Sequence, residues 1–173
     1  DQNGVGAITV HGRTRKQRFT GMSNHEAIQK VKQAVSVPVI GNGNIRCGKD
    51  AEKMIRETGC DGIMIARGAL GNPWVYREVA AVLETGQTLP PPTLIERAAA
   101  LREHFQYLLE FYGEHQALLH SRRVLHWFVS GVPGSAELRN RGNTVSSIAE
   151  FEEIVNSFQS ADFVETPWKQ EAP

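Results

Sequence analysis

The chain has 173 residues, of which 40% are hydrophobic, and its 19 lysines and arginines balance 19 aspartates and glutamates. This composition, with two cysteines, excludes a wholly disordered chain, a collagen-like repeat and a disulfide scaffold. A formal net charge of zero argues against a strongly cationic nucleic-acid binder, so any contact with RNA has to come from a local basic patch.

The sequence contains no signal for a membrane or a metal. No apolar run approaches the roughly 20 residues that cross a bilayer, and the chain does not begin with a charged segment followed by an apolar one. Cys47 and Cys60 are too far apart for a CxxC redox or zinc motif. We therefore expect a soluble, cytoplasmic protein without a metal site, in which both cysteines are packing thiols.

Residues 1–92 alternate short apolar runs with helical periodicity. The apolar runs predict three buried strands, over residues 6–11, 37–41 and 62–65. A helix is expected after Asn24, a candidate N-cap, and another over about 49–58, ending at Gly59. Continuously apolar strands separated by single helices predict a parallel sheet covered on both faces, and so an α/β fold built of βα repeats.

The pattern changes after the stiff connector LPPP at 89–92. Amphipathic stripes predict three helices, over about 101–112, 118–129 and 148–158. Ser147 and Glu150 form a candidate capping box for the last of them. We predict a small helical bundle over 93–160 and a polar tail over 161–173.

The predicted strands of residues 1–92 are too few for a complete barrel. Three parallel strands leave edges that need partners, and a TIM (β/α)₈ barrel needs about 250 residues. The simplest interpretation is that the chain is the carboxyl-terminal part of a longer protein, in which residues 1–92 supply strands 6–8 of such a barrel.

A glycine-bearing polar motif follows each predicted strand, where parallel sheets and barrels place their ligands. The motifs are HGRTR at 11–15, GNGNI at 41–45 and ARGALGNPW at 66–74. Glycines let backbone N–H groups approach an anion, and Arg67 can add a charge-assisted hydrogen bond. Together they predict a phosphate site. Taken singly, each motif also fits a simpler reading: a tight turn, a core histidine or a surface salt bridge.

Two groups of cations are candidates for RNA contacts, because arginine bridges phosphates. The first stands within six residues with no acid between them: Arg13, Arg15, Lys16 and Arg18. The second lies in a stretch with Glu137 as its one acid: Arg122, Arg123, Arg139 and Arg141. A solvated loop is the alternative for the first group. Trp127 could stack on a base, although a core position fits it better.

Taken together, the segments AITVHGRTR, VPVIGNGNI and TGCDGIMIARGALGNPW closely resemble the tRNA-dihydrouridine synthases, particularly their bacterial B-type branch. The resemblance continues through FYG at 111–113, RR at 122–123, Trp127 and AELR at 136–139. It implies a flavin-bearing (β/α)₈ barrel followed by a helical domain that binds tRNA. The implied activity is the reduction of tRNA uridines to 5,6-dihydrouridine by FMN, which NADPH reduces.

The resemblance also implies roles for particular residues. It places the phosphate end of FMN at Asn42, Gly43, Asn44, Ala66 and Arg67, and it places His11 beside the flavin. It assigns RNA contacts to Arg13, Arg15, Arg122 and Arg123. Asn44 and Ala66 stand where the family usually has aspartate and glycine, and Ala66 would strain its loop if a positive φ were required there. Val124 replaces a histidine that relatives often carry.

The family's catalytic cysteine follows the fourth strand of the barrel and its flavin-contacting lysine belongs to the fifth, so neither is expected in this chain. The chain alone is therefore expected to be inactive. Two alternatives stay open. One is another FMN- or phosphate-binding barrel that oxidises or reduces a small molecule, which has no reason to carry the helices after Pro92. The other is a non-enzymatic RNA-binding helical module.

Overall fold

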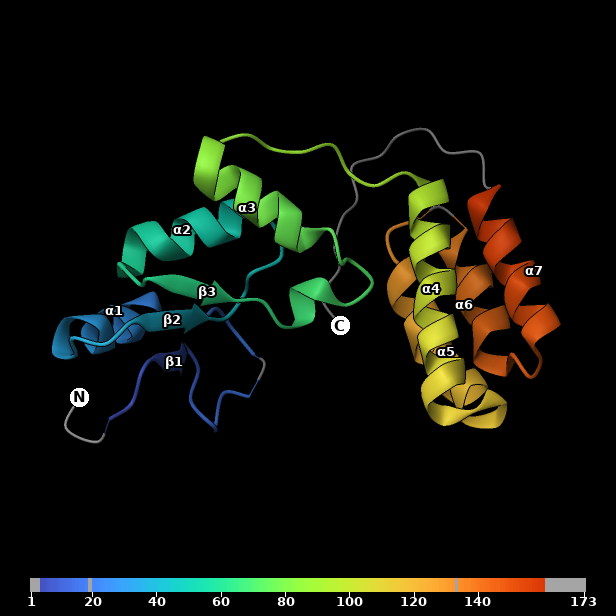
Figure 1. Cartoon of the computed structure of the whole chain (residues 1–173), viewed down its shortest axis with the longest axis horizontal. Coiled ribbons are helices and arrows are strands. Elements are labelled where there is room, and N and C mark those ends of the chain that lie inside the picture. The colour runs from blue at the N-terminus through green and yellow to red at the C-terminus, as the bar shows by residue number, and fades with distance from the viewer. Residues whose placement is uncertain (1–3, 19, 133, 161–173) are drawn as a thin grey trace. The chain divides into compact units, whose positions relative to one another are not determined.

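The computed structural model describes residues 4–18, 20–132 and 134–160. The chain forms two compact units (Figure 1). The first contains the described residues up to Ala69 together with Pro73–Leu89, and the second contains Leu70–Asn72 and the described residues from Pro90 onward.

The first unit is built on a parallel sheet of three strands in the order β1-β2-β3. These strands are β1 (Ile8–His11), β2 (Val39–Asn42) and β3 (Gly62–Met64). In the register, His11 pairs with Asn42, and Asn42 pairs with Met64. The predicted strands and the α/β class are confirmed, and the carboxyl ends of all three strands lie at one edge of the sheet.

A helix follows each strand of this unit, and the first two lie at the expected places. These helices are α1 (His25–Ala34), α2 (Gly48–Thr58) and, after the short 3₁₀ helix η1 (Arg67–Ala69), α3 (Val75–Thr85). The side chain of Asn24 caps α1 by accepting from the Ala27 N–H at 3.0 Å, as predicted. Helix α2 ends at Gly59, whose φ of 67° is left-handed, which confirms the predicted stop.

The helices of the first unit bury one face of its sheet. The hydrophobic core between these helices and the sheet consists of Ile28, Val39, Ile45, Ala51, Met54, Cys60, Val75 and Val79. On the strands, Thr9 and His11 are exposed, and Met64 is 49% exposed. The prediction of a sheet covered on both faces is therefore wrong for the described part of the chain. Apolar strand residues such as Met64 need a covering layer that the described residues do not supply.

The second unit contains four helices in its described residues, α4 (Leu94–Tyr112), α5 (Glu114–Val129), α6 (Ser135–Thr144) and α7 (Ile148–Gln159). Helix α4 packs against α5 and α7, and the rings of Phe105 and Phe151 stack with centroids 3.9 Å apart. Helix α6 was not predicted, because its sequence is polar and has no apolar stripe. None of the helices in the described ranges is long and apolar enough to cross a membrane.

Side-chain caps fix where two of these helices begin. Thr93 and Glu96 form a complete capping box at α4, with the Thr93 N–H donating to Glu96 Oε2 at 2.7 Å. At α7 the Ser147 hydroxyl accepts from the Glu150 N–H at 3.2 Å, as predicted. The Glu150 carboxylate, however, accepts from the N–H and hydroxyl of Ser146, so the predicted box is half formed.

Arg97 of α4 is a buried cation within the second unit. Its guanidinium donates to the carbonyl oxygens of Phe128 and Ser130 and lies 5.3 Å from the centroid of the Phe158 ring. Burial lowers the pKa of Arg97 to about 10. Arg97 therefore holds the carboxyl end of α5 against α4 and stays charged at neutral pH.

Candidate functional site

The carboxyl ends of the strands bring the three sequence motifs together. His11 ends β1, and its pairing partner Asn42 ends β2. The amide Nδ2 of Asn42 donates to the Met64 carbonyl oxygen of β3 at 2.8 Å. The side chain of Asn42 thus bridges to the strand that leads into Ala66 and Arg67.

Arg13 and Asn44 join the loop after β1 to the loop after β2. Arg13 Nη2 donates to Asn44 Oδ1 at 2.7 Å and to the Gly21 carbonyl oxygen at 2.7 Å. Asn44 Oδ1 also accepts from the Ser23 N–H at 2.8 Å. Asn44 has a φ of 57°, a left-handed conformation that asparagine tolerates better than most residues. The oxygen of Asn44 therefore acts as an internal acceptor.

Two glycines allow these loops to approach each other closely. Gly43 has a φ of 135°, and a Cβ there would lie 2.3 Å from Ser23 Oγ. A Cβ at Gly68 would lie 2.1 Å from the Ile45 carbonyl oxygen, so the loop after β3 rests on the backbone of the loop after β2. Ala66 is not among the described residues with positive φ, so the strain considered for it does not arise.

The edge formed by these loops is electropositive. Arg13 is 9% exposed, its Nε is buried without a hydrogen-bond partner among the described residues, and no ion pair in the described ranges includes it. Burial, and then the nearby charges of Arg67 and Arg46, lower the pKa of Arg13. Three guanidinium groups from three strand-end loops therefore act on one region, as an anion site requires.

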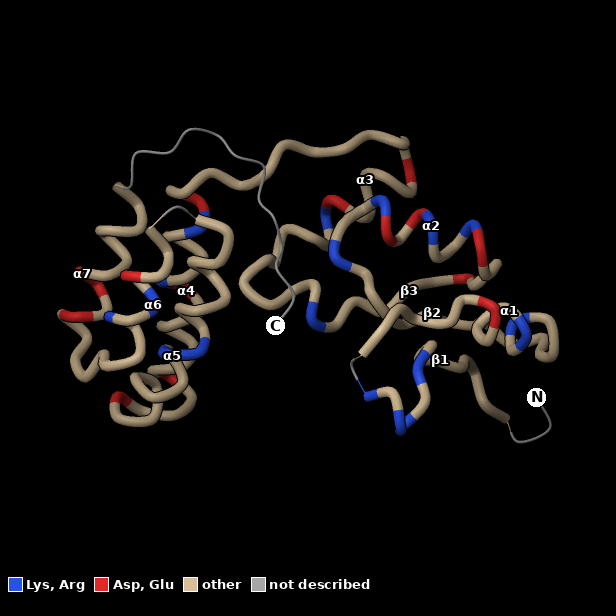
Figure 2. Tube along the Cα trace, turned by 180° about the vertical axis from the view of Figure 1, so that it is seen from behind, with Lys and Arg blue, Asp and Glu red and all other residues tan. Residues whose placement is uncertain are grey.

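The tip of the loop after β1 presents cations to solvent. The Gln17 N–H donates to the Thr14 carbonyl oxygen at 3.1 Å, and this turn leaves three basic side chains exposed: Arg15, Lys16 and Arg18. The same loop carries basic and no acidic positions in Figure 2. Arg13 is buried, whereas these three neighbouring cations are exposed to solvent.

Neither cysteine has the environment of a reactive thiol. Cys60 is buried in the core of the first unit. Cys47 is the N-cap residue of α2, and burial raises the pKa of its thiol, which disfavours the thiolate. No group of three or more metal-ligating side chains occurs in the ranges that the structure describes.

The four arginines of the second unit differ in their surroundings. Arg122 donates through Nη2 to the Val145 carbonyl oxygen at 3.0 Å, where α6 ends. Arg139 donates to Ser135 Oγ and Arg141 to Ser157 Oγ. Arg123 is exposed. Val124 is 5% exposed and faces the core.

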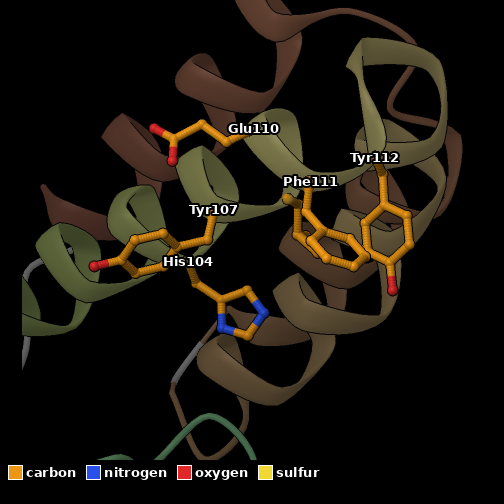
Figure 3. Close-up of a pocket in the computed structure, with 6 residues that line it drawn as sticks. His104, Tyr107, Glu110, Phe111 and Tyr112 are labelled. Atoms are coloured by element: carbon orange, nitrogen blue, oxygen red, sulfur yellow. The ribbon is translucent and has the colours of Figure 1, made fainter.

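A cluster of exposed aromatic rings on α4 was missed by the sequence reasoning. It borders a hollow of about 510 Å³ lined by His104, Tyr107, Leu108, Glu110, Phe111 and Tyr112 (Figure 3). Tyr112, predicted to join the apolar stripe of this helix, is 48% exposed, and Phe111 is 79% exposed. The sequence of residues 103–121 has three glutamates and no lysine or arginine, so this surface does not suit a phosphate.

Comparison with known proteins agrees with the resemblance seen in the motifs. The family model for "Dihydrouridine synthase (Dus)" matches residues 1–163. "tRNA-dihydrouridine synthase B" of Xanthomonas axonopodis pv. citri (strain 306) is 42% identical over 144 residues, which are 82% of this chain and 43% of that protein.

Two further relatives also carry the name tRNA-dihydrouridine synthase and match a similar share of this chain. "tRNA-dihydrouridine synthase B" of Pseudomonas aeruginosa PAO1 is 41% identical over 83% of this chain and 43% of its own length. "Probable tRNA-dihydrouridine synthase" of Rickettsia conorii is 35% identical over 93% of this chain and 49% of its own length. The chain thus spans about half the length of these curated relatives. Since the family model matches more than nine-tenths of it, the chain belongs to the dihydrouridine synthase family.

Proposed function

We propose that this chain is the carboxyl-terminal part of a tRNA-dihydrouridine synthase that reduces uridine to 5,6-dihydrouridine in tRNA. In this proposal FMN is the cofactor, NADPH is the reductant and the enzyme acts in the cytoplasm, where tRNA is found. Membership of the family supports the reaction class. The structural observation that supports the proposal most strongly is that the buried Arg13 guanidinium joins the loop after β1 to the loop after β2 and lies near the charges of Arg67 and Arg46.

The proposal includes a (β/α)₈ barrel to which the first unit contributes its last three strands. The open sheet face with Met64 supports this, as do the outer edges of β1 and β3, with which no strand of the described residues pairs, because further strands would cover both. Helices α4–α7 would then be the tRNA-binding domain over residues 93–160. The tail predicted over 161–173 lies outside the described residues.

The residues present fit the phosphate end of a flavin mononucleotide. A phosphoryl group is a dianion near neutral pH, and the loops offer the buried Arg13 with the charges of Arg46 and Arg67 nearby. Asn42, Gly43, Asn44, Ala66 and Arg67 would hold this end, as the strand-end position of their loops allows. The phosphate would fit these loops because they offer cationic and N–H donors and because they follow the carboxyl ends of the strands of the proposed barrel.

His11 would orient the flavin from the open face of the sheet. It is exposed, and its Nδ1 lies 3.8 Å from the position of a Cβ on Gly43, which puts its ring beside the proposed phosphate loop. Reduced FMN, when bound, would supply hydride to a uracil taken out of its stack. The proton donor is not assigned to this chain, because Cys47 and Cys60 are packing thiols.

Among the four arginines predicted to contact RNA, we propose Arg15 and Arg123 for direct phosphate contacts. Both are exposed. Arg13 and Arg122 instead donate to protein acceptors, Asn44 Oδ1 and the Val145 carbonyl oxygen. Their contribution to tRNA binding would then be to hold the loop after β1 and the end of α6 in place.

The test uses a protein of the relatives' full length that contains this chain. Unmodified tRNA is incubated with the protein, FMN and NADPH, and dihydrouridine is measured by mass spectrometry of the nucleosides. We expect dihydrouridine to form in the presence of NADPH, and to form more slowly with Arg123→Gln at limiting tRNA. Arg77→Gln, which removes an exposed arginine from α3, is the matched control and should leave the rate unchanged. A protein that binds FMN yet leaves every tRNA uridine unreduced would instead favour the small-molecule oxidoreductase.

A further inference from the structure

Arg13 is a buried cation whose protein partners are uncharged. Its Nη2 donates to the Gly21 carbonyl oxygen and to Asn44 Oδ1, each at 2.7 Å, and its Nε is buried without a hydrogen-bond partner among the described residues. Ion pairs do form elsewhere in this unit, for example between Lys32 and Asp61. The described residues provide no carboxylate for Arg13.

A buried charge without a counter-ion is costly, and arginine does not escape the cost by losing its proton at neutral pH. The nearby positive charges of Arg67 and Arg46 increase this cost. Gly68, next to Arg67, lies so close to the loop after β2 that a Cβ on it would stand 3.1 Å from the Arg46 Cα. The loops that hold Arg13 therefore bring further positive charge to it, and a negative charge is needed to complete the site.

We propose that the phosphoryl group of the bound cofactor is the counter-ion of Arg13, and that the neutral Asn44 leaves this role to the ligand. The inference rests on the proposed function and deepens it. Arg13 becomes a positioning residue that holds two loops together and makes their arrangement depend on a bound anion. The site would thereby prefer FMN to riboflavin, which has the same ring system and no phosphoryl group.

The variant Asn44→Asp separates a charge effect from a hydrogen-bond effect. Aspartate keeps the side-chain oxygen that accepts from Arg13 and from the Ser23 N–H, and like asparagine it tolerates the left-handed φ of 57°. The substitution therefore adds an internal counter-ion and little else. If Asn44 served only as an acceptor, neither stability nor ligand preference would change.

The experiment compares the full-length protein with its Asn44→Asp variant. Dissociation constants for FMN and for riboflavin are measured by flavin fluorescence, and Tm is measured without flavin, with and without inorganic phosphate. For Asn44→Asp we expect a higher Tm in the absence of anions, a smaller Tm increase from phosphate, and about tenfold weaker FMN binding. Riboflavin binding should not change. Asn140→Asp on α6, which adds the same charge at an exposed position, should change none of these.

A second variant keeps the test decisive if Asn44→Asp folds poorly. Arg13→Gln removes the cation and retains a donor, and it should abolish the Tm increase from phosphate and reduce the preference for FMN over riboflavin. Unchanged FMN affinity in both variants, or an equal loss for riboflavin, would overturn the inference while the proposed function stands. A wild-type protein that binds neither FMN nor phosphate would overturn both.

Discussion

Gly68 lies where the loop after β3 touches the backbone of the loop after β2. A methyl group at this position would stand 2.1 Å from the Ile45 carbonyl oxygen, a separation that no real Cβ accepts. Because the neighbouring atom belongs to the backbone, the conflict can be relieved only by moving one of the two loops. The close approach therefore depends on the absence of a side chain at residue 68.

We expect Gly68→Ala to lower the free energy of unfolding by about 2 kcal/mol, as overpacking does, and to weaken FMN binding because the loops separate. Chemical denaturation and flavin titration of the full-length protein measure the two effects. Gly62→Ala is the control, since its Cβ would meet Ile40 at an ordinary 3.8 Å. Equal stability of the two variants would show that the loops are not in contact.

Sequence reasoning identified the residues at this edge but not their partners. The types and positions of Asn44 and Arg67 predicted a phosphate loop, and the structure places both after their strands. The acceptor role of Asn44 depends on Arg13 and Ser23, which are 31 and 21 residues away in sequence. Such pairs follow from strand register, which local patterns do not reveal.

At the scale of elements, Asp61 ties three pieces of the first unit together. Its carboxylate accepts from Lys32 of α1 at 2.7 Å and from the Val39 N–H of β2 at 2.7 Å, just before β3 begins. The hydrogen bond from Lys32, and then that from the Val39 N–H, lower the pKa of Asp61.

This shift predicts how stability depends on pH. An acid whose folded pKa is lowered stabilises the fold above its unfolded pKa, about 3.9 for aspartate, and this stabilisation is lost as the pH falls through the lower folded value. Wild type should therefore melt at a higher temperature than Asp61→Asn near neutral pH, and the gap should close in strong acid. Thermal melts of both proteins from neutral pH to strong acid test this prediction, with Glu84→Gln, a substitution at an exposed position, as the control. A gap that persisted in strong acid would contradict the assignment.

The capping box of α4 makes a second prediction at this scale. Thr93→Ala removes the hydroxyl that accepts from the Glu96 N–H and should lower the free energy of unfolding of the second unit by about 1 kcal/mol. Denaturation followed by circular dichroism measures it. Thr88→Ala, in the exposed connector, should have no comparable effect. Matching losses in the two variants would mean that the cap is not formed in solution.

The periodicity of apolar residues predicted most helices but not all. Stripes such as that of α7, with Phe151, Ile154, Val155 and Phe158 buried, follow the 3.6-residue repeat. Helix α6 has two buried residues, Leu138 and Gly142. It fills a place beside α5, where a Cβ on Gly142 would lie 3.4 Å from Leu125. Tertiary packing therefore decides the conformation of this segment.

For the whole molecule, the balance of charge constrains how the proposed tRNA substrate would be bound. The chain has no formal net charge, so in this proposal the affinity for tRNA would depend on a few exposed cations. Arg15→Gln and Arg123→Gln should each reduce the slope of log affinity against log salt by about one. Filter binding of tRNA at several salt concentrations measures the slope, and Arg77→Gln is again the control. Slopes that did not change would exclude these arginines as phosphate contacts.

The sequence also predicted the parallel sheet, but it did not show whether the helices of this chain bury one face of the sheet or both. Continuous apolar strands indicate that both faces are buried, yet the described helices bury one face and leave His11 and Met64 exposed on the other. The apolar residues of a strand predict that its sheet face is buried. They do not identify which segment of a protein packs against that face.

The most direct test of the account is the flavin content of the full-length protein. We predict that it binds FMN at about one equivalent, that Arg67→Gln weakens this binding about tenfold through the loss of a charge-assisted hydrogen bond, and that Arg77→Gln does not. A protein without flavin that also fails to bind added FMN, or one whose FMN affinity is indifferent to residue 67, would contradict the central claim that these strand-end loops hold the flavin phosphate.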